Sequence, residues 1–440
     1  MPKTASKQTI ARAYILMLIS PPVSLLSSLR SMTFNQRRWL LIIAGTIMGA
    51  TFLFDEIGDG IRHYEIVKTY YSDITFLEFV DVTWKILTLQ GSEMIRGDLY
   101  IHLISYFSGG ILSYPMFFWV IVGFIYSYFY VSSIFKIYEL YGVHSTTFLF
   151  VLLFSIFICL KSFEGIQFVR TLTGFWVMFY GVLQYHITQK RKYLVLIFLF
   201  PPLIHFGFLA LALPAWALIF LNTQNRIIKI SLVAVFITSF FITIEQAQIL
   251  EITTATELGE GRTQSYHRAD REAQLLQLDR IGGRNFYAAF HDAGLTNAFI
   301  LGIAFTLILS QSYFTRFTSI ESKLFGIGLT SYSLSNFIPF LYAVSNRSAG
   351  IALIFLMAAI ALYVKRTHLS YDKHKFKSLE SKFILFFGVL LSYFFLYRFA
   401  VIIQWLSAYF FAFPIIPILF GDANMTVREF LGPVFEPLFN

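Results

Sequence analysis

The 440-residue chain is 57% hydrophobic and 19% aromatic, and only 13% of its residues are charged, against about a quarter in soluble domains. This composition excludes a soluble enzyme and predicts an all-α, polytopic transmembrane bundle, because a soluble core could not hide so many long apolar segments. The net charge of +9 does not indicate nucleic-acid binding, since the basic residues lie in short loops between apolar segments, and the positive-inside rule makes such loops cytoplasmic.

The N-terminal segment, residues 1–38, contains an apolar run at 13–29 that includes Pro21 and Pro22. Basic residues flank this run on both sides, and the proline pair interrupts a continuous helix. We therefore expect an uncleaved interfacial helix along the inner face of the membrane. A membrane-crossing segment is the alternative.

About eleven spans are expected between residues 39 and 420, ahead of a C-terminal tail at 421–440. The first span, 39–54, leads to an external segment at 55–98. Residues 99–113 then dip back from the outer face, and 114–133 return inward. The remaining expected spans are 145–160, 171–188, 193–207, 208–221, 228–244, 298–313, 324–342, 349–364 and 383–397.

Two long segments, 55–98 and 245–297, are expected to form helices outside the membrane. The second carries five arginines and no lysine, and guanidinium groups bind phosphate oxygens in pairs, as lysine cannot. Arg271 lies on a predicted helix that ends at paired glycines, and Arg284 follows them. Both are candidate phosphate ligands. Surface ion pairing with neighbouring acids is the alternative for each arginine.

Three further arginines, Arg170, Arg347 and Arg398, fall at the expected outer ends of spans. An arginine buried at membrane depth costs at least ~2.5 kcal/mol unless a partner compensates it, so such residues are functional candidates by default. Snorkelling to the lipid headgroups is the alternative explanation.

Candidate proton acceptors lie in the same outer region. His205 follows a proline pair at the end of its segment, and His291 lies in the second external segment. Asp59, Arg62 and His63 follow the first span, with Asp59 and Arg62 one helical turn apart. A carboxylate beside arginine is a poor base, so a histidine is favoured as the base and Asp59 is expected to orient Arg62 or the substrate.

The sequence contains no glycine-rich phosphate loop and no paired Cys or His at metal-binding spacing, so neither a cofactor nor a metal is expected. No cytoplasmic domain is large enough for an ATPase or a nucleotide-sugar transferase. Any chemistry is therefore expected outside the cell membrane, on a substrate that is already activated. A lipid pyrophosphate meets that requirement.

Four short motifs occur near the outer span ends. They are the run Asp59–Tyr64, the arginine at the head of Phe168–Gly181, the apolar hairpin with one histidine at Pro201–Trp216, and the arginine in Asn346–Gly350. Together with the span pattern, these motifs resemble the EpsG-like and Wzy-type polysaccharide polymerases, with which a GT-C-like architecture would be compatible.

The resemblance implies a metal-independent glycosyltransferase in the bacterial inner membrane. Its substrates would be undecaprenyl-pyrophosphate-linked oligosaccharides at the external face, joined into an O-antigen or exopolysaccharide, with a chain-length regulator as a partner and no nucleic acid. Arginines would neutralise the departing pyrophosphate. A flippase for lipid-linked saccharides and a ligase of similar architecture are the alternatives.

Overall fold

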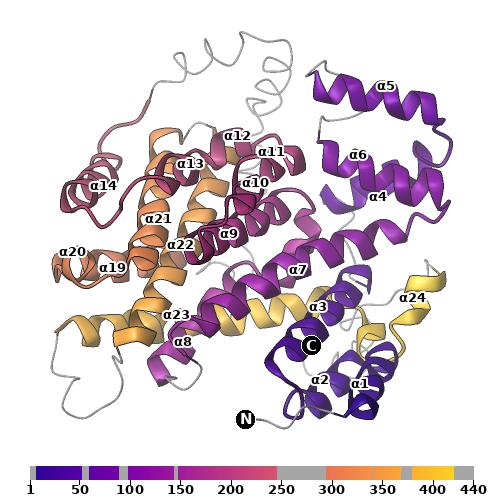
Figure 1. Ribbon diagram of the computed structural model, residues 1–440, viewed down its shortest axis with the longest axis horizontal. Helices are drawn as coiled ribbons and strands as arrows, with labels where there is room; N and C mark the ends of the chain where they lie inside the picture. Colours follow the sequence, from indigo (N-terminus) through magenta and orange to yellow (C-terminus); the bar gives the residue numbers. More distant parts are fainter. Residues whose placement is uncertain are drawn as a thin grey trace, which may run out of the picture.

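The computed structural model describes residues 6–51, 59–88, 98–142, 147–244, 294–339, 341–367 and 379–420 (Figure 1). Within these ranges every regular element is a helix. Three helical stretches are long and apolar enough to cross a membrane: Phe117–Glu139, Phe148–Phe168 and Val344–Thr367. The all-helical class is thus confirmed, whereas the expected count of about eleven spans is not.

The helices follow one another along the chain with several short elements in between. They are α1 (Lys7–Ile19), α2 (Pro21–Ser28), α3 (Phe34–Thr51), α4 (Asp59–Thr69), α5 (Phe76–Leu87), α6 (Leu99–Ser105), the π-helix η1 (Tyr106–Ile111), α7 (Phe117–Glu139), α8 (Phe148–Leu160), the 3-10 helix η2 (Phe163–Phe168), α9 (Thr171–Thr188), η3 (Arg191–Tyr193), α10 (Leu194–Phe198), α11 (Phe200–Ile204), α12 (Phe208–Leu211), α13 (Leu213–Ile219), α14 (Arg226–Thr238), α19 (Leu295–Leu309), α20 (Ser312–Thr315), α21 (Ser319–Phe337), α22 (Tyr342–Thr367), α23 (Leu379–Trp405), η4 (Ala408–Phe410) and α24 (Ile415–Phe420).

Helix α22 forms the centre of the bundle. It packs against α21, α8, α12 and α19, and the side chains from Ile351 to Val364 are buried. The close approach of α21 to α22 depends on a glycine. A Cβ added at Gly328 of α21 would lie only 2.7 Å from Cγ of Leu356 of α22. Close approach over a small residue is how membrane helices gain van der Waals contact without a hydrophobic driving force.

A second packed layer joins α3, α7 and α9 (Figure 1). Here two glycines face each other, since a Cβ on Gly49 would lie 2.9 Å from Cα of Gly123. Both backbones therefore need glycine at this crossing. The layer fixes the first turn of α9, where Arg170 is the N-cap residue.

The hairpin expected at 193–207 and 208–221 is present, but each arm is broken into two short helices. The arm formed by α10 and α11 runs from Leu194 to Ile204, which at 1.5 Å per residue extends only ~16 Å, about half of a ~30 Å hydrocarbon core. Prolines begin α11 and α13 and account for the breaks. The tip of the hairpin contains His205, and α11 packs against α6. Non-helical backbone of this kind is tolerated in a membrane where protein surrounds it or where it lines a water-filled cavity.

Within the segment expected to be external, the described residues form helices α4 and α5, so the helices expected there are confirmed for this part. His102 of α6 connects them: its Nδ1 is 2.6 Å from the hydroxyl of Tyr71, and its Nε2 is 3.0 Å from the hydroxyl of Thr83. His102 is fully buried. These contacts hold α4 and α5 against the helix that begins directly after Asp98.

Candidate functional site

Asp98, Arg170, His205 and Arg347 meet in one buried polar cluster, the Asp98 cluster. Arg170 Nη1 donates to Asp98 Oδ2 over 2.5 Å, and the backbone N–H of Phe206 donates to Asp98 Oδ1 over 2.9 Å. His205 Nδ1 lies 3.3 Å from Asp98 Oδ2, and Arg347 Nη1 lies 3.0 Å from His205 Nε2. Four segments that are far apart in the chain thus supply one continuous network.

The hydrogen bonds assign the tautomer of His205. Guanidinium can only donate, so Arg347 requires His205 Nε2 to be an acceptor. The proton of the neutral ring is then on Nδ1, from which it is donated to the Asp98 carboxylate. A neutral imidazole with a carboxylate behind it and an unprotonated Nε2 in front is the arrangement of a general base.

The Asp98 carboxyl is ionised in this setting. Burial by itself would raise its pKa, but the hydrogen bond to His205, the charge of Arg170 and the N–H of Phe206 outweigh burial and hold that pKa well below its usual range. The exposed fraction of the Asp98 side chain is only 3%. Two guanidinium groups and one carboxylate leave the cluster with an excess positive charge of one.

Each segment presents its side chain for a local reason. Arg170 is the N-cap of α9, and Arg347 lies in the first turns of α22. His205 ends α11 in an extended conformation, which is where the proline-broken hairpin turns. Asp98 is the N-cap of α6, yet its carboxylate makes no cap hydrogen bond and is committed to the cluster instead.

Sequence reasoning selected Arg170, His205 and Arg347 separately but did not single out Asp98. Asp98 is the last of the nine acids in the external segment 55–98 and directly precedes an apolar run. This position was the only feature of the sequence that could have pointed to Asp98. Its partners come from segments 72 and 107 residues later in the chain.

The other candidates near the first span lie on α4. Asp59 begins that helix, Arg62 is exposed, and His63 is 7% exposed. Helix α4 packs against α6 and η2, next to the segments that supply Asp98 and Arg170. Of the predicted residues, the hydrogen bonds bring together Arg170, His205 and Arg347.

Four candidates are placed only in part or not at all. Arg271, Arg284 and His291 lie outside the described residues, as does the predicted helix at 265–281. The expected span 383–397 is part of α23, which continues to Trp405, so Arg398 lies within a helix and not at its end.

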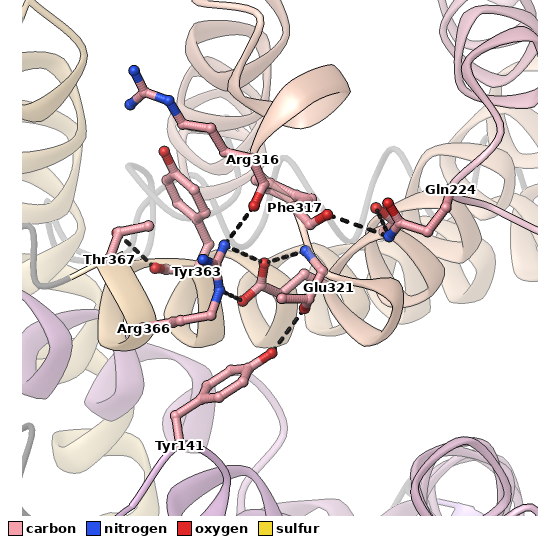
Figure 2. Close-up of polar contacts among 10 residues, drawn as sticks. Tyr141, Gln224, Arg316, Phe317, Glu321, Tyr363, Arg366 and Thr367 are labelled. Atoms are coloured by element: carbon pink, nitrogen blue, oxygen red, sulfur yellow. Dashed lines mark hydrogen bonds and ion pairs between the residues drawn. The ribbon is translucent and has the colours of Figure 1, made fainter.

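A second polar cluster lies at the opposite end of α22 (Figure 2). Arg366 donates to both oxygens of Glu321, over 2.8 and 2.9 Å, and to the carbonyl of Arg316 over 2.6 Å. Glu321 also closes a capping box with Thr318, whose hydroxyl is 2.8 Å from that of Tyr141. These contacts fasten the end of α22 to the start of α21 and to the turn after α7.

Removal of one partner from this second cluster should be strongly destabilising. Glu321 is fully buried, so Arg366→Ala leaves a buried carboxylate without its counter-ion and should lower the free energy of unfolding by about 3 kcal/mol. Denaturant unfolding in mixed micelles measures the change. The matched control is Lys85→Ala, which removes an exposed pair with Asp81 and should change little. Equal losses in both variants would contradict a structural role for the Glu321–Arg366 pair.

The two clusters mark opposite ends of α22. Nineteen residues separate Arg347 from Arg366 along the helix, which corresponds to roughly 28 Å and matches the ~30 Å hydrocarbon core. Lys365 beside Arg366 donates to the carbonyl of Tyr138 near the end of α7. The Asp98 cluster therefore belongs to one side of the bundle and the Lys365–Arg366 pair to the other.

Comparisons of the chain with models of protein families, with curated proteins and with solved structures give no match.

Proposed function

We propose that the protein is a membrane glycosyltransferase that polymerises undecaprenyl-pyrophosphate-linked oligosaccharide repeat units at the outer face of the bacterial inner membrane. One observation carries the proposal: two guanidinium groups, those of Arg170 and Arg347, converge on a buried Asp–His pair. Basic residues at the Arg366 end of α22 support the assignment of the Asp98 cluster to the external side.

The arginines suit the departure of a lipid pyrophosphate. When the bond between the anomeric carbon and the phosphate oxygen breaks, its electron pair remains on the pyrophosphate. Fixed cations at that position stabilise the developing charge without reorganisation. Arg347 is the more available of the two, because its observed partner is the neutral His205, whereas Arg170 already neutralises Asp98.

The Asp–His pair suits activation of the acceptor. A sugar hydroxyl that attacks the anomeric carbon must lose its proton, and His205 Nε2 is the atom that would accept it. Asp98 would then stabilise the imidazolium through the Nδ1–H bond. In this order of events, Arg347 leaves Nε2 of His205 and binds the pyrophosphate when the substrates bind. This one movement exposes the base and also supplies the cation.

A flippase for lipid-linked saccharides is the second candidate, and the broken hairpin α10–α13 favours it. Discontinuous helices are typical of transporters, in which half-helix ends line the substrate site. The Asp–His pair favours the transferase, since transport requires no proton acceptor for a sugar hydroxyl.

The surface glycan of a strain that lacks this chain tests the proposal. For a polymerase we expect single repeat units on the lipid carrier or on the surface, with long chains restored by the wild-type gene. Loss of all surface glycan would indicate a flippase or ligase instead, and normal chain lengths would contradict all three functions.

A further inference from the structure

Four aromatic side chains form a continuous row across α3, α7, α9 and η3, which we call the aromatic row. The ring centroids of Trp39 and Tyr128 are 5.9 Å apart, and those of Tyr128 and Tyr180 are 6.5 Å apart. Tyr193 extends the row, with its ring 6.4 Å from that of Tyr180. All four side chains are partly exposed, so the row lies on the surface of the bundle. Tyr and Trp, which have an apolar body and a polar tip, are enriched at the membrane–water boundary.

A cation lies at each end of the aromatic row. The guanidinium carbon of Arg38 is 5.8 Å from the centroid of the Trp39 ring, and Nζ of Lys192 is 5.2 Å from that of the Tyr193 ring. The charge of Arg38 also acts on the hydroxyl of Tyr180, in the middle of the row. Within the described part of the chain, the side chains of Arg38 and Lys192 form no ion pair and no hydrogen bond. Both cations are therefore available to an anion.

The elements that carry the aromatic row offer no acid to neutralise these cations. Asp and Glu are absent from residues 1–54 and 165–244, which include α3, α9 and η3. The one acid of α7, Glu139, forms an ion pair with Lys136 of the same helix. An excess of positive charge therefore remains on this surface, and it attracts anions from solution or from the membrane.

The aromatic row belongs to the side of the bundle opposite the Asp98 cluster. Helix α9 begins next to Arg170 and runs for 18 residues, roughly 27 Å, before η3 follows. At the start of α3, the ring centroid of Phe34 is 6.3 Å from that of Tyr138, whose carbonyl accepts a hydrogen bond from Lys365. Arg38 lies one helical turn after Phe34. The positive-inside rule makes this side cytoplasmic.

We propose that Arg38 and Lys192, with the aromatic row between them, bind the headgroup of an anionic phospholipid of the inner leaflet. The two cations would hold the phosphate, and the amphipathic rings would contact the glycerol and the upper acyl chains. Phe124, which is 43% exposed and lies 6.3 Å from Tyr128, extends the apolar surface along α7 toward the membrane centre. Basic pockets between membrane helices on the cytoplasmic side are typical sites for anionic headgroups. A zwitterionic lipid brings an ammonium group of its own, which the two cations repel.

Native mass spectrometry of the full-length protein in detergent, titrated with phosphatidylglycerol, tests the site. Arg38→Gln combined with Lys192→Gln should raise the Kd of the tightest-bound phosphatidylglycerol by a factor of roughly 10–30, because two cations near an anionic headgroup are lost. Arg38→Lys keeps the charge and should bind nearly as the wild type does. Arg226→Gln, which removes an exposed arginine of α14 outside the row, is the matched control and should also retain wild-type affinity.

The outcomes distinguish this site from general surface charge and from the carrier lipid. Wild-type affinity for phosphatidylglycerol in the double variant, or an equal loss in Arg226→Gln, would overturn the site. Phosphatidylcholine bound as tightly as phosphatidylglycerol would also overturn it, since the cations would then contribute nothing. Displacement of phosphatidylglycerol by a lower concentration of undecaprenyl phosphate would assign the surface to the carrier lipid instead. Because the row lies apart from the Asp98 cluster, a positive result would stand even if the polymerase assignment failed.

Discussion

Replacement of Arg347 by alanine is expected to lower the rate of polymer formation at least a hundredfold, while the protein still accumulates in the membrane. Loss of one fixed donor to a developing anion commonly costs a factor of about 10²–10³ in rate. Arg347→Lys should restore little of this rate, because a point charge cannot bind two phosphate oxygens side by side. Chain extension on a purified lipid-linked repeat unit measures the effect.

Arg170→Ala should be as inactive as Arg347→Ala, but for two reasons that act together. Arg170 is the ion-pair partner of the buried Asp98, so its removal leaves a carboxylate short of a cation and also disturbs the site. Arg226→Ala, an exposed arginine in the first turn of α14, is the matched control and should be fully active. Normal polymer from Arg347→Ala at normal expression would contradict a role for this arginine in pyrophosphate departure.

Three members of the Asp98 cluster could be selected from the sequence, because a polar group in an apolar segment is costly to bury without a partner. Arg170, His205 and Arg347 each interrupt or terminate an apolar segment, where an uncompensated polar group is costly and must find a partner. This argument identifies residues that need partners. It cannot say which partners they find, because the packing of α9, α22 and the hairpin decides that.

Asp98, the partner of Arg170 and His205, could not be identified from the sequence. A residue that directly precedes an apolar helix has an ordinary local explanation as an N-cap. In the structure its carboxylate makes no cap hydrogen bond and instead bonds to Arg170 and to the N–H of Phe206. Only the tertiary structure reveals that commitment, since none of these contacts is local in sequence.

The fold class could be predicted from the sequence, but the lengths of the helices and the number of spans could not. Composition required a helical membrane bundle, and the proline pair indicated a break before His205. Hydropathy could not reveal that α10 and α11 together extend only ~16 Å, because short helices buried in protein are as apolar as full spans. The span count therefore exceeds what the described helices support by length and composition.

The second large effect is expected at His205. If His205 accepts the proton of the acceptor hydroxyl, His205→Gln should lower the rate of chain extension by a factor of about 10²–10⁴. Binding of inorganic pyrophosphate should be retained, because Arg170 and Arg347 are unchanged. The same assay on His63→Gln should show near-normal extension, since the hydrogen bonds of His205 assign the base to that ring and not to His63 of α4.

Asp98→Asn distinguishes a base from a merely structural histidine. The amide can still accept the Nδ1–H bond of His205, so the ring can remain in place, but it cannot stabilise the imidazolium by charge. We therefore expect a large loss of extension rate with little loss of donor binding in Asp98→Asn, as in His205→Gln. Normal extension in both variants would exclude the Asp–His pair as the base. If His63→Gln or His291→Gln alone abolished extension, the base would lie in another segment, and the Asp98 cluster would serve only to hold the pyrophosphate.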